Sequence, residues 1–168
     1  MLNATDNLDY VKHFQTLAQV HLAMRRQGPT AARLLQRAYL EVEMGNFDAG
    51  LQSARDAVAL DSSCGEAHFQ IARTYVFMAL AKAGAMPLGP ALQTSVRGPT
   101  ATLLEEAVIA FRAAVAINPE DAEAQRDLEA VQGILDCCND ERTLLQALRS
   151  KISVADEVMG DSAAKSDE

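Results

Sequence analysis

Residues 106–124 read EAVIAFRAAVAINPEDAEA and contain a helix, the signal that ends it and the start of a second helix. Alanine and other apolar residues run as far as Ile117, a composition that favours helix. Pro119 then ends the first helix, because proline has no backbone N–H and cannot continue the hydrogen-bond pattern. Glu120 and Asp121 follow, where carboxylates stabilise a helix N-terminus. This stretch predicts one helix over about 100–117 and another over about 119–136.

The composition of the whole chain agrees with this pattern. Its 168 residues are 49% hydrophobic but only 5% aromatic, with no Trp. The apolar residues are mainly 30 Ala and 19 Leu, which lead the scale of helix propensity. We therefore predict an all-α fold with closely packed helices, and the same numbers argue against a β-sandwich, a barrel or an aromatic platform for bases.

The net charge and the cysteines limit the classes of partner and the cellular compartment that we expect for this chain. The formal net charge is −8, which disfavours binding to nucleic acid or to an anionic membrane surface. Cys64, Cys137 and Cys138 are odd in number and include an adjacent pair, which suits a reducing compartment. The N-terminus lacks the features of a signal peptide, and the longest apolar run, residues 75–81, is too short to insert into a bilayer. We expect an acidic, soluble, cytoplasmic protein.

Helix and loop signals divide the chain into four parts. We expect an N-terminal helix within residues 1–28, an array of helix pairs over 29–136, a C-terminal helix within 137–159 and a disordered tail over 160–168. The array begins after Gly28-Pro29, with Thr30 as the expected helix cap. Its expected helices cover about 31–44, 47–60, 65–84, 100–117 and 119–136. A loop rich in Gly and Pro, about 84–99, interrupts it.

The array contains an internal repeat. In a 34-residue frame that opens at Ala31, small residues recur where two antiparallel helices must cross, at Gly50, Ala54 and Ala57. A second frame opens at Gly65, but its matching residues begin at Ala107 instead of position 84. The second unit therefore carries an insertion of 23 residues, located at the loop.

These residues resemble the tetratricopeptide repeat family. The segment 106–124 is similar to the second helix of such a repeat, its closing Asn-Pro and the start of the next repeat, and residues 45–51, GNFDAGL, resemble the family's turn. The resemblance covers about 31–135 and implies two antiparallel helix pairs stacked as a short α-solenoid, with capping helices at its ends. Arg37 and Glu41 stand where the family usually has apolar residues, and Ser62 replaces its usual proline.

No catalytic, metal or cofactor motif is present in the sequence. His13, His21 and His68 are spread over different parts of the chain, and the adjacent Cys137-Cys138 pair lacks the spacing of a redox or metal motif. Phosphate-binding loops and nucleophile elbows are also missing. We therefore expect a protein that is not an enzyme and that needs neither cofactor nor metal.

The resemblance implies a concave groove lined by the first helix of each pair. Positions 5, 9, 12 and 13 of each frame would face it, which are Leu35, Tyr39, Val42 and Glu43 in the first unit and Phe69, Arg73, Val76 and Phe77 in the second. The aromatic members are suited to anchoring a peptide or a helix. Some of these residues must instead pack against the first helix or the insertion.

The insertion is a second candidate for contact with a partner. It carries Met86, Leu88, Leu92 and Val96 and would form a lid, a longer helical hairpin or a contact surface. We expect a non-catalytic adaptor, scaffold or chaperone-like module that binds a protein or peptide in its groove. The alternative is an obligate subunit or a homo-oligomer whose groove is filled by its own terminal helix.

Overall fold

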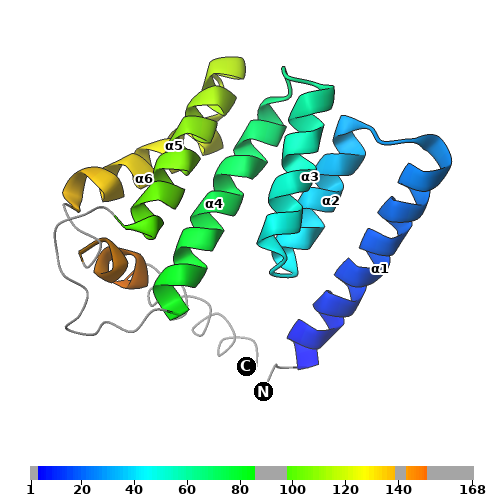
Figure 1. Ribbon diagram of the computed structural model, residues 1–168, viewed down its shortest axis with the longest axis horizontal. Helices are drawn as coiled ribbons and strands as arrows, with labels where there is room; N and C mark the ends of the chain where they lie inside the picture. Colours follow the sequence, from blue (N-terminus) through cyan, green and yellow to red (C-terminus); the bar gives the residue numbers. More distant parts are fainter. Residues whose placement is uncertain (1–3, 86–97, 139–142, 151–168) are drawn as a thin grey trace, which may run out of the picture.

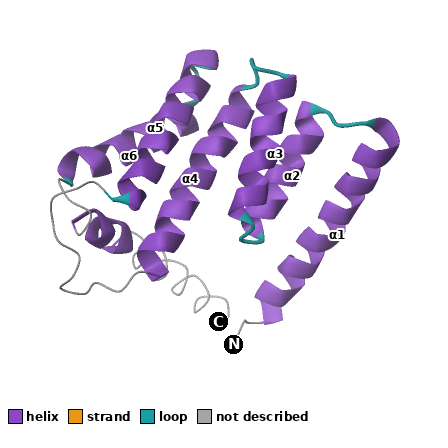
Figure 2. Cartoon of the chain, viewed as in Figure 1, coloured by secondary structure: helices purple, strands orange, loops and turns teal. Residues whose placement is uncertain are grey.

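A computed structural model describes residues 4–85, 98–138 and 143–150, and every regular element in these ranges is a helix (Figure 2). The predicted all-α class is therefore confirmed. The helices are α1 (Ala4–Gln27), α2 (Ala31–Glu43), α3 (Phe47–Leu60), α4 (Gly65–Ala85), α5 (Pro99–Ile117) and α6 (Ala122–Cys137), followed by a further helix at 143–150. None of the helices in the described ranges has both the length and the apolar character needed to cross a membrane.

The helices lie side by side in chain order (Figure 1). α2 pairs with α3 and α4 pairs with α5, and α3 joins the two pairs by packing against α4. α2 also contacts α4, so the first helices of successive pairs are neighbours. α1 forms one end of the row, and α6 packs on α5 at the other.

Local chemistry sets the helix ends, mostly at the residues that the sequence predicts; α6 is the exception, since it begins at Ala122 and not at about residue 119, after the Asp121 cap. The Thr30 side chain accepts a hydrogen bond from the backbone N–H of Arg33 and caps α2, as expected. The Asp121 carboxylate accepts from the N–H groups of Glu123 and Ala124 and caps α6. Gly45 ends the α2 region with φ of 77°, a conformation that glycine adopts without steric cost.

Small residues let the paired helices approach closely. A Cβ on Gly50 would lie 2.6 Å from Val42 Cγ2, so α3 meets α2 where a side chain has no room. Ala54 and Ala57 are fully buried, as is Ala107 in the α4–α5 pair. These are positions at which the repeat pattern places helix crossings.

The main core extends from α3 to the helix at 143–150. Its largest fully buried side chains include Phe111 and Leu104 of α5 together with Leu144, Leu145 and Leu148. Arg149 Nε donates a hydrogen bond to the backbone oxygen of Ala83 at 2.8 Å, which fixes the short helix on the end of α4. A smaller cluster centred on Leu34 joins α2, α3 and α4, and Met24 of α1 packs against it.

Candidate binding cleft

A cleft of about 410 Å³ opens between α4, α5, α6 and the helix at 143–150. On α4 and α6 its lining residues recur every three or four positions, which places them along one face of each helix. Apart from Arg73 and Asp127 the lining is apolar. We call this site the α4–α6 cleft, and it is lined by Arg73, Val76, Phe77, Leu80, Leu104, Phe111, Asp127, Ala130, Val131, Ile134 and Leu148.

The α4 wall of the cleft is a stack of an arginine and two aromatic rings. The Arg73 guanidinium carbon lies 5.7 Å from the ring centre of Phe69 and 5.6 Å from that of Phe77. Phe69 and Phe77 flank Arg73 by four residues on each side, so all three side chains share one helix face. Phe69 also meets Phe111 of α5 edge to face, with ring centres 5.7 Å apart. The arginine therefore lies against one ring that belongs to the core, Phe69, and one that is partly buried, Phe77.

The α6 wall carries the negative charge of the cleft. Burial raises the pKa of the Asp127 carboxyl above its ordinary value, and the charge of Glu123 raises it further. Arg73 and Arg126 act in the opposite direction but do not cancel these effects. Asp121 adds to the raising effect. Asp127 is thus a partly buried carboxylate beside an apolar surface, and Glu123 and Asp121 lie close enough to repel its charge.

The structure brings three of the eight expected groove residues together in this cleft, namely Arg73, Val76 and Phe77. Phe69 lies beneath them at 5% exposure and belongs to the core. Val42, also at 5% exposure, is packed against α3 near Gly50. Neither side chain is available to a partner, because close helix packing has buried both.

The other three expected groove residues lie on α2, outside the cleft lining. Leu35 packs on the smaller cluster, beside Met24 of α1. Tyr39 and Glu43 are exposed, with 44% of the tyrosine accessible. The four residues of the insertion, Met86, Leu88, Leu92 and Val96, lie outside the described residues.

Sequence reasoning missed the α6 side of the cleft, although a signal for it existed. A third 34-residue frame opens at Ala122 once the insertion is counted, and its ninth and thirteenth positions are Ala130 and Ile134. Both line the cleft. Extending the frame by one helix would have found them, whereas no periodic signal predicts the contribution of Leu148.

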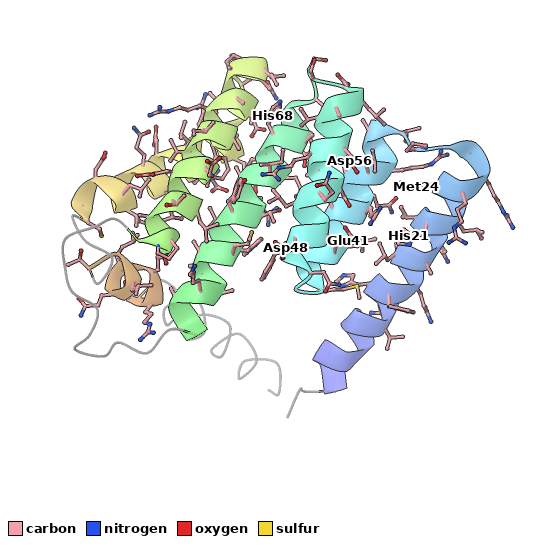
Figure 3. All side chains as sticks on the ribbon, viewed as in Figure 1. His21, Met24, Glu41, Asp48, Asp56 and His68 are labelled. Atoms are coloured by element: carbon pink, nitrogen blue, oxygen red, sulfur yellow. The ribbon has the colours of Figure 1, made fainter. Side chains whose placement is uncertain are left out.

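Titratable residues elsewhere in the described part of the chain do not gather into a metal site. No group of three or more His, Cys, Asp or Glu residues there is placed to hold an ion. Figure 3 places His21 on α1 and His68 on α4, well separated along the row.

Protein-family models offer no match to this chain, and neither do the curated proteins.

Proposed function

We propose that this chain is a non-catalytic protein–protein interaction module, built as a short array resembling tetratricopeptide repeats, that binds an amphipathic helix or peptide in the α4–α6 cleft. The observation that carries this proposal is the cleft itself. It combines an apolar lining with two charged groups, which is the composition expected of a site that anchors apolar side chains and fixes their orientation.

The stacked wall of the cleft favours an anchoring role. Phe77 and Arg73 belong to residue types that are enriched in protein–protein interfaces relative to the rest of the surface. Stacking on two rings restricts the arginine before any partner arrives, which reduces the entropy lost on binding. A reducing compartment such as the cytoplasm belongs to the same proposal, on the strength of the odd cysteine count.

Photo-crosslinking from inside the cleft tests the proposal. Ala130 is exposed and lines the cleft, so a benzoylphenylalanine at this position reports what enters. The matched control carries the same group at Glu129, the preceding residue of α6, which is exposed and outside the lining. We expect defined protein adducts from position 130 that are absent from position 129.

A second variant separates anchoring from mere proximity. Phe77→Ala removes one ring of the cleft wall and leaves the buried Phe69 in place, so adducts from position 130 are expected to decrease strongly. Circular dichroism checks that the helices remain. Equal labelling from positions 129 and 130, or labelling that Phe77→Ala does not change, contradicts the proposal.

A further inference from the structure

Helix α1 has two apolar faces, and only one of them is packed. Val20 lies at 5% exposure on the inner face, and Met24 on the same side packs on the cluster around Leu34. On the opposite face Val11, Phe14 and Leu22 are 45%, 59% and 48% exposed. Figure 1 shows α1 as the outermost helix of the row, so none of the helices within residues 4–85, 98–138 and 143–150 lies beside this second face.

The exposed residues form one continuous stripe. Val11, Phe14, Ala18 and Leu22 follow one another at intervals of three or four residues, which places them along a single line of the helix. Arg25 continues the same line into the last turn and is exposed. We call these five residues the outer stripe of α1. Such a stripe, apolar along its length and cationic at one end, is an amphipathic surface that lacks a partner in the described chain.

The charge at the end of this stripe is complementary to that of the α4–α6 cleft. The cleft has an apolar lining with Arg73 on α4 and a carboxylate, Asp127, on α6; burial first and then the charge of Glu123 raise the pKa of this carboxylate. The outer stripe has apolar side chains and a guanidinium, Arg25. An arginine brought to Asp127 would add to the attraction of Arg73 and Arg126 and oppose the repulsion of Glu123 and Asp121.

Placing Arg25 at Asp127 fixes the relative direction and register of the two helices. Asp127 and Ile134 are seven residues apart on α6, and Arg25 and Ala18 are seven residues apart on α1. At 1.5 Å per residue both separations are about 10.5 Å along the helix axis. The acid is at the N-terminal end of its face and the arginine at the C-terminal end of its stripe, so the two helices would run antiparallel. Ala18, a small residue, would then lie opposite Ile134 and allow a close approach.

We propose that the α4–α6 cleft of one copy receives the outer stripe of α1 from a second copy of this chain. This inference rests on the proposed function of the cleft and names its occupant. The contact must be between copies, because α1 is held against α2 at the opposite end of the row from α6. It is also a head-to-tail contact, since the two surfaces differ.

Light scattering coupled to size exclusion tests the inference with two variants that leave the core intact. Phe14→Glu places a charge on the outer stripe, and Ala130→Arg places a bulky cation in the cleft; both positions are exposed on helices. The controls are Ile109→Glu, at a 62% exposed apolar residue of α5, and Glu129→Arg on α6. We expect the wild type and both controls to associate as concentration rises, and each of the two variants to remain a single chain.

Mixing the two variants distinguishes a head-to-tail contact from a symmetric one. The Phe14→Glu chain keeps an intact cleft and the Ala130→Arg chain keeps an intact outer stripe. A mixture is therefore expected to form a complex of two chains and no larger species. If α1 instead paired with α1, Ala130→Arg alone would still associate, and the Phe14→Glu chain would not enter its complexes when the two are mixed. Either result overturns the inference.

The result for the wild type separates this inference from the proposed function. A wild type that stays a single chain from micromolar to near-millimolar concentration overturns the inference. The proposed function survives that outcome if position 130 still crosslinks to a different protein in a manner dependent on Phe77. If neither self-association nor specific crosslinking occurs, both proposals fail.

Discussion

The carboxylate of Glu41 on α2 accepts a hydrogen bond from the hydroxyl of Ser53 on α3, with 2.8 Å between Glu41 Oε2 and Ser53 Oγ. Glu41, labelled in Figure 3, is buried at 5% exposure. Arg37 Nε donates to the other carboxylate oxygen of Glu41 at 2.9 Å. A buried charge is tolerated only with such partners. The two polar residues that depart from the repeat pattern on α2 are therefore members of one network that joins the first helix pair.

Removing the serine hydroxyl will destabilise this pair. Ser53→Ala leaves the buried Glu41 carboxylate without its donor from α3, and the cost of such a loss is about 1–3 kcal/mol in the free energy of unfolding. Urea denaturation followed by circular dichroism measures it. Gln52→Ala, at an exposed position of the same helix, is the control and should change stability by about 0.5 kcal/mol or less. Equal effects of the two substitutions would show that the network contributes nothing.

Alanine substitution at two glycines within helices will change folding stability in opposite directions. Gly50→Ala places a Cβ 2.6 Å from Val42 Cγ2 and 3.0 Å from the Ala38 carbonyl oxygen, and such overpacking costs about 1–3 kcal/mol. The gain in helix propensity, about 1 kcal/mol, offsets only part of it. Gly133 on α6 is exposed with nothing within 4 Å of the added Cβ. Gly133→Ala should therefore stabilise by roughly 0.5–1 kcal/mol. Thermal melting of both variants gives the comparison, and a stabilised Gly50→Ala chain would contradict the close approach of α2 and α3.

The helices were predictable from sequence because their ends carry strong local signals. α3 begins and ends at Phe47 and Leu60, as predicted, since Gly45-Asn46 precedes it and a run of polar residues, 61–63, follows. The Asp61 carboxylate accepts hydrogen bonds from the N–H and hydroxyl of Ser63, which lower its pKa and complete that turn without the family's proline.

The division between core and cleft was not predictable in the same way. Phe69 and Phe77 lie about two turns apart on one face of α4. Only Phe69 is buried, because Phe111 of the next helix covers it. Periodicity identifies a face but not how far the neighbouring helix extends over it. The end of the cleft depends on a contact between Arg149 and Ala83, 66 residues apart, for which no local pattern exists.

The two rings of α4, Phe69 and Phe77, should also differ in how much they contribute to folding stability. Phe69→Ala empties a buried position in contact with Phe111 and is expected to cost about 3–5 kcal/mol of folding stability. Phe77→Ala removes a ring that is only partly buried, and its cost is roughly 1–2 kcal/mol. Urea midpoints measure both. If Phe77→Ala were as damaging as Phe69→Ala, Phe77 would be a core residue and not a wall of the cleft.

Replacement of Asp127 by its neutral isostere will alter the pH dependence of stability. The pKa of Asp127 is raised in the folded chain, first by burial and then by Glu123, so its ionisation disfavours the folded state. That penalty is absent below the ordinary aspartate pKa of about 3.9, and it develops as the pH rises through the raised value. Asp127→Asn should therefore melt at a higher temperature than the wild type at neutral pH, and the difference should disappear in acid.

The neighbouring carboxylate supplies the control for this titration. Glu129→Gln removes an equal charge from an exposed position of α6. Subtracting its change in melting temperature from that of Asp127→Asn corrects for the change in net charge of the acidic chain. What remains is the local effect of the cleft on Asp127. A lower melting temperature for Asp127→Asn at neutral pH would mean that attraction to Arg73 outweighs burial and the charge of Glu123. The carboxylate would then already be neutralised within its own chain, and it would have little left to offer an arginine from a partner.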